Sequence, residues 1–314
     1  MQYIADLTEG KRISQIFLCK SKALATTKNG KNYYNLVLQD KTGTIDGKVW
    51  DLTNSIEHFE AGDFIQCDCE VLLYNKSMQL NIRRIRRAHE GEYDPGDYCP
   101  VSPFDTEKMY KDLLELAGKV KNEKLRALIK SYFVDDAAFI GQFKTHSAAK
   151  SVHHGFIGGL LQHTLGVMRL CYFYCQQYPV LNKDLLLTAA LFHDIGKVKE
   201  LSDFPSNDYT DDGQLLGHIV IGYQMVMERI HQIPDFPERL ASELGHCILA
   251  HHGELEFGSP KKPELMEALA LSMADNTDAK LEVMTEALAQ AEGLEWQGFQ
   301  KFLDANIRRT SPQA

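Results

Sequence analysis

The spacing of apolar residues changes once along the chain and divides it into two parts. From Arg12 to about Arg86, apolar and polar residues alternate in short runs between turn signals, a pattern typical of β-strands. From Thr106 onward, apolar residues recur every three or four positions, which is the period of an amphipathic helix. Residues 91–105 mix glycine, proline and acidic residues without a period, so they are predicted to form a linker.

The first part predicts five strands, with a short helical piece near Ser55 to Phe59 between the third and the fourth. Turn signals such as Asn29-Gly30 separate the strands, because both residues of this pair tolerate a positive φ. This order of elements is that of an OB-fold barrel. The five predicted strands are Arg12 to Ala25, Tyr33 to Asp40, Thr44 to Trp50, Phe64 to Tyr74 and Met78 to Arg86.

Alternation along the second and third strands places two aromatic side chains on the outer face. Leu36, Leu38 and Val49 are expected to point into the barrel, so Tyr33 and Trp50 point outward. Outward aromatic rings near basic residues predict a stacking platform for single-stranded nucleic acid, although Trp50 packing against the following helical piece is an alternative. The basic residues assigned to this platform are Lys20, Lys22 and Lys48.

The second part predicts an all-α helical bundle. Three helices with N-caps at Asp105, Asn122 and Asp135 come first. Five more are expected, and they carry most of the histidines: Gly158 to about Tyr178, Lys183 to Phe192, one beginning near His218, Pro237 to about His251, and Glu264 to about Lys280. The expected organisation is therefore an OB domain at 1–90, the linker, a helical connecting region at 106–150, a histidine-bearing helical domain at 151–295 and a tail at 296–314.

Histidine and aspartate residues gather on these helices or at their ends. Taken singly each has an ordinary explanation, and the pair His193-Asp194 alone could be a capped helix end. Taken together, seven nitrogen and oxygen ligands suit two divalent cations, and a carboxylate shared between them would support hydrolytic attack on phosphorus. The seven are His163, His193, Asp194, His218, His251, His252 and Asp275.

The charge distribution agrees with this division. The net charge is -9, yet residues 1–90 hold 13 Lys and Arg against 11 Asp and Glu, whereas the remainder holds 21 against 32. The acidic second part is what carboxylate-bearing metal sites would give. The seven cysteines form no CxxC pair, and no apolar run approaches the roughly 18 residues of a spanning helix, so we expect a reduced cytoplasmic protein without a membrane partner.

The ordered pattern H…HD…H…HH…D resembles that of the HD-superfamily metal-dependent phosphohydrolases. The resemblance implies that the seven residues ligate two metal ions, with Asp194 as the bridging carboxylate and a catalytic residue. It also implies that Lys197, in the phrase LFHDIGK, lies near the substrate phosphate as a second catalytic residue. The alternative for Lys197 is that it complements the C-terminus of a helix, where a cation is favoured.

A more specific resemblance covers nearly the whole chain. The phrases TTKNGKNYYNLVLQDKTGTIDGKVWD, HHGFIGGLLQHT and LFHDIGK are similar to those of the YhaM family of 3'-to-5' exoribonucleases. This implies Mn²⁺-dependent removal of nucleotides from the 3' end of single-stranded RNA, with DNA as a further substrate, releasing nucleoside 5'-monophosphates. Fe²⁺ and Mg²⁺ are the alternative metals. His153 and His154 fall within the second phrase and either contact substrate phosphates or serve in capping and packing.

Two other functions compete. The first is an HD-superfamily phosphodiesterase acting on nucleotides or cyclic nucleotides, but Gly258-Ser259-Pro260 stands where the cyclic-dinucleotide class has Gly-Tyr-Pro. The second is a non-enzymatic single-strand-binding module, which the complete ligand pattern disfavours. A homo-oligomer, the choice between RNA and DNA, and the placement of the OB domain over the site stay open.

Overall fold

The computed structural model describes all residues except 28–29, 53–54, 76, 151–153, 290–294 and 312–314. It divides into two compact units, which we describe separately. One consists of Met1–Val101 with Phe204–Ser206, and the other of Ser102–Asp203 with Asn207–Ala314. None of the described helices is long and apolar enough to cross a membrane.

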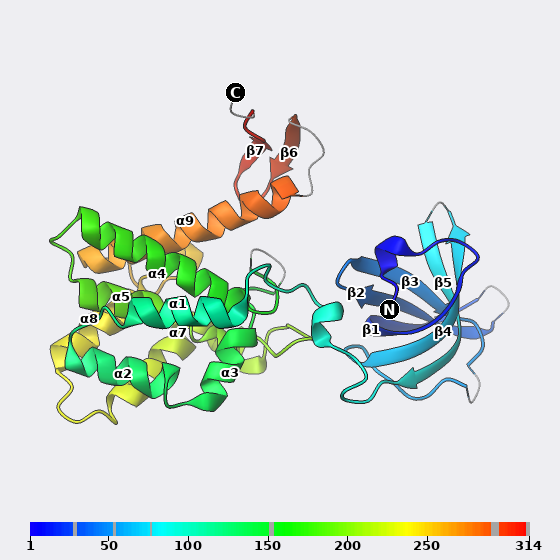
Figure 1. Ribbon diagram of the computed structural model, residues 1–314, viewed down its shortest axis with the longest axis horizontal. Coiled ribbons are helices and arrows are strands. Elements are labelled where there is room, and N and C mark those ends of the chain that lie inside the picture. Colours follow the sequence, from blue (N-terminus) through cyan, green and yellow to red (C-terminus); the bar gives the residue numbers. More distant parts are fainter. Residues whose placement is uncertain (28–29, 53–54, 76, 151–153, 290–294, 312–314) are drawn as a thin grey trace. The chain divides into compact units, whose positions relative to one another are not determined.

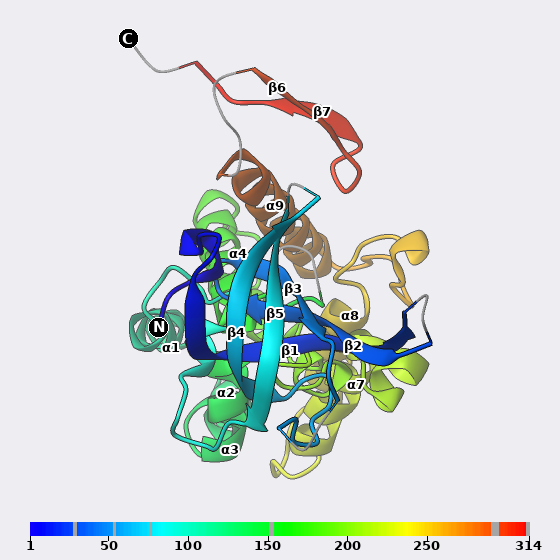
Figure 2. The ribbon, with the colours of Figure 1, turned by 90° about the vertical axis from the view of Figure 1, so that its right-hand side faces the viewer.

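The first unit is a closed five-stranded barrel, as the sequence predicts (Figure 1; Figure 2 shows the strands face on). The strand order is β1-β2-β3-β5-β4, and β4 pairs back onto β1. The contact between β3 and β5 is parallel, whereas the other pairings are antiparallel. The strands are β1 (Arg12–Thr26), β2 (Asn32–Asp40), β3 (Gly43–Val49), β4 (Phe64–Tyr74) and β5 (Ser77–Arg87).

The predicted alternation of β2 and β3 is confirmed. Leu36, Leu38 and Val49 are buried in the barrel core, and Trp50 is exposed. The register pairs Tyr34 with Val49, which brings Tyr33 close to Trp50 on the other face. The core of the barrel is therefore built from one face of each strand.

The prediction of a helical piece near Ser55 to Phe59 is wrong. Residues 55–59, which the structure describes, form no helix, because their backbone runs beside β5 instead. The amide of Glu57 donates to the carbonyl of Ile85, the amide of Ile85 donates to the carbonyl of Ser55, and Phe59 enters the barrel core. Because β5 already pairs with the backbone groups of this segment, forming a helical turn would add no hydrogen bond there.

Much of the predicted linker also differs from expectation. A short 3-10 helix, η2 (Pro95–Asp97), is followed by Tyr98 and Cys99, both of which are buried. The ring of Tyr93 stacks on Phe64 with 3.9 Å between ring centroids, and Gln39 donates to the carbonyl of Tyr98 at 2.9 Å. These aromatic contacts make the segment part of the first unit.

The second unit is a helical bundle around one apolar core, and the all-α prediction is confirmed up to residue 289 (Figure 1). At its centre lies α5, in which every residue from Leu185 to Phe192 is buried. A helix buried on all sides delivers the residues at its end into the core. The helices are α1 (Thr106–Ala117), α2 (Glu123–Phe133), α3 (Ala137–Thr145), α4 (Gly159–Gln177), α5 (Lys183–Phe192), α6 (Lys197–Glu200), α7 (Asp211–Ile230), α8 (Glu238–Leu249) and α9 (Met266–Ala289).

Local details of the bundle differ in three places. The N-cap of α3 is Asp136, which accepts from the amide of Phe139, whereas Asp135 pairs with Lys130. Helix α7 begins at Asp211 rather than near His218, and Gly217 interrupts it with a φ of 73° just before that histidine. The predicted tail contains a hairpin of β6 (Trp296–Gln300) and β7 (Ala305–Arg308).

Gly196 allows α6 and α7 to pack closely, and replacing it tests this contact. A Cβ there would lie 2.0 Å from the carbonyl oxygen of His218 and 2.6 Å from the amide nitrogen of Gly222, both backbone atoms of α7. We expect Gly196→Ala to lower the free energy of unfolding by about 1–3 kcal/mol, because neither backbone can move aside easily.

Urea denaturation measures this change, and Gly141→Ala is the matched control. Gly141 lies within α3 and a Cβ there meets nothing within 4 Å, so this variant should gain about 0.5–1 kcal/mol. Equal stabilities for Gly196→Ala and the wild type would contradict the close packing.

Candidate functional site

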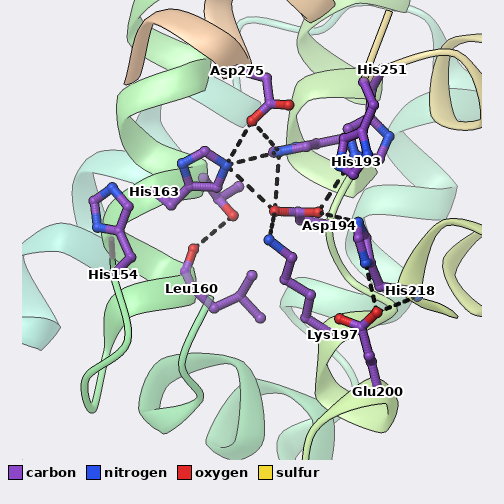
Figure 3. Close-up of polar contacts among 12 residues, drawn as sticks. His154, Leu160, His163, His193, Asp194, Lys197, Glu200, His218, His251 and Asp275 are labelled. Atoms are coloured by element: carbon purple, nitrogen blue, oxygen red, sulfur yellow. Dashed lines mark hydrogen bonds and ion pairs between the residues drawn. The ribbon is translucent and has the colours of Figure 1, made fainter. Parts of the chain in front are cut away.

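The end of α5 places His193 and Asp194 in the interior of the helical unit. Both side chains are buried, with exposed fractions of 0% and 2%. The Nδ1 of His193 donates to the carbonyl of Ala190, one turn back, at 2.8 Å. This bond fixes the ring so that its Nε2 faces the neighbouring helices (Figure 3).

The predicted ligands form two groups of three. The ligand atoms of His163, His193 and Asp275 all lie within 4.8 Å of one another, and we call this group the first triad. Those of His218, His251 and His252 do the same and form the second triad. Helices α4, α5, α7, α8 and α9 carry these residues or end beside them.

Asp194 lies between the triads and turns one carboxylate oxygen toward each. Its Oδ2 lies 3.4 Å from Nε2 of His163 and 3.5 Å from Nε2 of His193. Its Oδ1 lies 3.4 Å from Nε2 of His218 and 3.6 Å from Nε2 of His251. The structure thus brings all seven predicted ligands together, in an arrangement in which Asp194 can bridge two cations. Figure 3 labels each of them except His252.

All five histidines are held by Nδ1, and in His163, His193, His218 and His251 it is Nε2 that lies near Asp194. A carbonyl or carboxylate partner requires that Nδ1 carry the proton, so Nε2 of each neutral ring offers a lone pair to the cluster. Metal-binding histidines in proteins are usually held in this way. The partners of Nδ1 are the carbonyls of Ala190 for His193, Ile248 for His251 and Phe257 for His252, and the carboxylates of Asp278 for His163 and Glu200 for His218, at 2.7–2.9 Å.

Three buried polar atoms at the centre fit a bound cation. Oδ1 of Asp194, Nε2 of His218 and Nε2 of His251 have no hydrogen-bond partner among the described residues. Leaving such a group unpaired in the interior costs about 1–3 kcal/mol. A divalent cation among these atoms would satisfy all three, and imidazole nitrogen with carboxylate oxygen is a donor set that such ions accept.

Burial and charged neighbours shift the pKa values of Asp194 and of both histidines in the first triad. Burial alone would raise the pKa of Asp194, but Lys197 and His193 beside it hold that pKa well below its usual range. Burial would also lower the pKa of His163, yet its contacts with Asp194, Asp275 and Asp278 raise it well above the ordinary value. In His193, burial prevails and lowers the pKa to about 4, so this ring is neutral at pH 7.

Lys197 forms an ion pair with the bridging carboxylate. Its Nζ lies 2.7 Å from Oδ2 of Asp194, and the residue lines a cavity of about 1270 Å³. Lys197 begins the four-residue helix α6, and its ammonium is directed at this carboxylate. The cavity is also lined by His163, His218, His252 and Asp275, which places both triads at its wall.

Two residues of the site, Asp278 and Glu200, were not predicted from the sequence. Asp278 accepts from Nδ1 of His163, and Glu200 accepts from both Nδ1 and the backbone amide of His218 at 2.9 Å. Asp278 lies three residues after Asp275 and therefore on the same face of α9, which is a signal that could have found it. Glu200 offers a weaker signal of the same kind, three residues after Lys197.

Gly166 on α4 allows the approach of Asp278, because a Cβ at this position would lie 2.0 Å from Oδ1 of the carboxylate. His154 lies on the far side of the same carboxylate, where its Nε2 is 3.1 Å from Oδ2 of Asp278. It is buried and is not among the cavity-lining residues, which favours the packing alternative over a phosphate contact. His153, the other tentative substrate contact, lies outside the described residues.

The aromatic pair expected on the barrel is present. The rings of Tyr33 and Trp50 stack with 4.6 Å between centroids, and Trp50 is 43% exposed. Lys20 is exposed, and Lys48 donates to the side chain of Asn35.

The position of Lys22 disagrees with its predicted contact with nucleic acid, because its side chain is only 12% exposed. Its Nζ donates to the carbonyl of Phe59 at 2.5 Å and lies 4.8 Å from the ring centroid of Tyr34. An ammonium held in this way stabilises the barrel and is not presented to a ligand. We therefore remove Lys22 from the predicted nucleic-acid contacts.

Comparisons with known proteins agree with both units. Residues 160–280 match the model of the HD domain, and residues 12–88 match that of an OB-fold nucleic acid binding domain. The chain is 35% identical to the 3'-5' exoribonuclease YhaM of a Geobacillus species over 289 residues, which cover 90% of this chain and 87% of that protein. The chain belongs to the YhaM family.

A second family member, the 3'-5' exoribonuclease YhaM of Bacillus velezensis, is 34% identical over 285 residues, which cover 90% of each chain. Among solved structures, the second OB-fold domain of replication protein A from Methanococcus maripaludis covers 29% of this chain with 18% identity and a TM-score of 0.24. A likeness that low carries no argument about function.

Asp278→Asn tests whether Asp278 orients His163 for metal binding. A neutral amide oxygen accepts more weakly than a carboxylate, and an amide can also turn its NH₂ group toward the ring, so Nδ1 of His163 is no longer firmly held in its protonated form. We expect metal affinity to fall about 10- to 100-fold, the usual effect of losing such a partner, with little change in unfolding free energy.

Equilibrium dialysis followed by elemental analysis measures the affinity. Glu282→Gln, one turn further along α9, is the matched control and should bind metal as the wild type does. An unchanged affinity in Asp278→Asn would remove the orienting role.

Proposed function

We propose that this protein is a divalent-metal-dependent 3'-to-5' exoribonuclease that shortens single-stranded RNA and releases nucleoside 5'-monophosphates. The observation that carries the proposal is the Asp194 carboxylate, which turns one oxygen to each of two ligand triads at the wall of a large cavity. Membership of the YhaM family and the barrel with its stacked pair of Tyr33 and exposed Trp50 support it.

Each group of residues has a separate task in this proposal. The first and second triads, together with Asp194, would hold two divalent cations, and such a pair supplies a nucleophilic water and stabilises charge on the phosphoryl oxygens. Asp278 and Glu200 keep two of the ligand rings in the required tautomer. Lys197, a cation at the cavity wall, binds an oxygen of the scissile phosphate.

The ligand types support the choice of metal. Five imidazole nitrogens outnumber the carboxylates, whereas Mg²⁺ prefers oxygen ligands and keeps several waters. We therefore propose Mn²⁺ as the working ion, with Fe²⁺ as the next candidate. Activity on single-stranded DNA, a homo-oligomeric state and a cytoplasmic location stay predictions from the sequence.

The proposal is tested by incubating 5'-labelled single-stranded RNA with the metal-stripped protein, with and without added Mn²⁺. Stepwise shortening that needs the metal, together with chromatographic detection of nucleoside 5'-monophosphates, supports the exonuclease. Turnover of free or cyclic nucleotides without shortening of RNA would point to the nucleotide phosphodiesterase. Binding of RNA without any turnover would point to the non-enzymatic module.

Asp194→Ala is expected to abolish hydrolysis, because it removes the only carboxylate that faces both triads in the described part of the chain. Bound metal should fall as well, whereas RNA binding should persist, since the aromatic pair lies on the barrel. Elemental analysis, the labelled-RNA assay and a filter-binding assay measure the three quantities.

The matched control is Asp112→Ala, which removes a carboxylate that pairs with Arg169 on the surface. Surface ion pairs contribute about 0–1 kcal/mol, so this variant should keep metal and activity. Hydrolysis retained in Asp194→Ala would disprove the bridging role.

Trp50→Ala tests the barrel as the RNA-binding surface. Loss of one base–aromatic stack should weaken binding of long single-stranded RNA by about 1–3 kcal/mol, with little effect on a dinucleotide. Phe173→Ala on α4, which removes another exposed ring, serves as the control in the same fluorescence-anisotropy titration. Equal affinity of Trp50→Ala and the wild type for long RNA would exclude the platform.

A further inference from the structure

The C-terminal hairpin contributes directly to the cavity wall. Strands β6 and β7 pair antiparallel, and Lys301 and Phe302 lie in the turn that joins them. Gln300, Lys301 and Phe302 line the same cavity as His163 and Asp275. The hairpin belongs to the helical unit, so its turn and the predicted metal ligands line a cavity within one unit.

Aromatic side chains from three separate segments line this cavity. Phe302 comes from the hairpin turn, Phe257 from the 3-10 helix η3 (Leu255–Phe257) and Tyr209 from the segment before α7. All three are exposed, Phe302 to 48%. The backbone carbonyl of Phe257 also accepts from His252, so the backbone of Phe257 is held next to the second triad. Exposed rings beside a phosphodiester-cleaving site offer faces on which bases can stack.

The cationic groups of the cavity fit phosphates. Lys150 and Lys197 have carboxylate partners, Asp208 and Asp194. For Lys280 and Lys301, no carboxylate among the described residues lies within 4.0 Å of the ammonium, although Glu200 and Glu286 also line the cavity. Ammonium groups that no described carboxylate pairs, Lys280 on α9 and Lys301 on the hairpin, are suited to the backbone of a bound strand.

The size of the cavity favours an oligonucleotide. Pockets for one small molecule measure roughly 300–1,000 Å³. The 1270 Å³ cavity exceeds that range and so has room for more than one nucleotide. An enzyme for free nucleotides needs no such space beyond the triads.

We propose that the β6–β7 turn, through Phe302 and Lys301, is a binding subsite for the last nucleotides at the 3' end of the single-stranded substrate. Phe302 stacks on a base, and Lys301 contacts a phosphate. Phe257 and Tyr209, from the other two segments, offer further aromatic rings. This inference deepens the proposed exonuclease function and rests on it.

The test compares Phe302→Ala with Phe299→Ala in steady-state kinetics on a labelled RNA tetranucleotide in the presence of Mn²⁺. Phe299 is an exposed phenylalanine of the same hairpin that does not line the cavity. We expect Phe302→Ala to raise KM about 5- to 150-fold, the range for loss of one stacked base, and Phe299→Ala to leave it unchanged. Phe302→Tyr keeps an aromatic ring and should retain a KM near that of the wild type.

The outcomes separate this inference from the function on which it rests. If the wild-type protein does not shorten RNA, the proposed function fails. If the wild type shortens RNA and Phe302→Ala has an unchanged KM, only the subsite is overturned. Thermal denaturation of each variant detects unfolding, and a KM raised equally by Phe302→Ala and Phe302→Tyr, with both folded, would also overturn stacking.

Discussion

The buried carboxylate of Asp194 is the constraint on which the helical unit depends. An anion removed from water costs several kcal/mol unless positive charge and hydrogen-bond donors surround it. Here four histidine Nε2 atoms lie 3.4–3.6 Å from its two oxygens, and the ammonium of Lys197 lies 2.7 Å from one of them. These partners come from helices α4 to α7 and the end of α8, so the helices must converge on one point. Helix α5, buried from Leu185 to Phe192, holds Asp194 at that point.

The same local device positions two of the ligands. The last carbonyls of a helix have no intrahelical partner, and at the ends of α5 and α8 a histidine donates its Nδ1 to the carbonyl three residues earlier. In each case the bond both satisfies the helix end and aims Nε2 at the cluster. His163 and His218 lie within helices or at a kink, so they need carboxylates from elsewhere, and Asp278 and Glu200 supply these.

Recognition of a strand and cleavage of its end make different physical demands. Stacking needs aromatic rings that solvent can reach, such as those of Trp50 on the barrel and Phe302 on the hairpin. Metal-assisted hydrolysis needs buried ligands with fixed orientations, as in the two triads. In the proposed function, β-strands and turns at the surface would meet the first demand, and helix ends in an apolar core would meet the second.

The sequence by itself determined the barrel, the bundle and the seven ligand candidates, because strand alternation, helix periodicity and ligand types are properties of local sequence. It did not determine that residues 55–59 follow β5, that Lys22 is buried, or that Asp278 and Glu200 hold ligand rings. Nor could it place the hairpin turn at the cavity. Only the tertiary structure decided these points. Each depends on a contact between segments distant in the chain, and local periodicity carries no information about which distant segment a side chain meets.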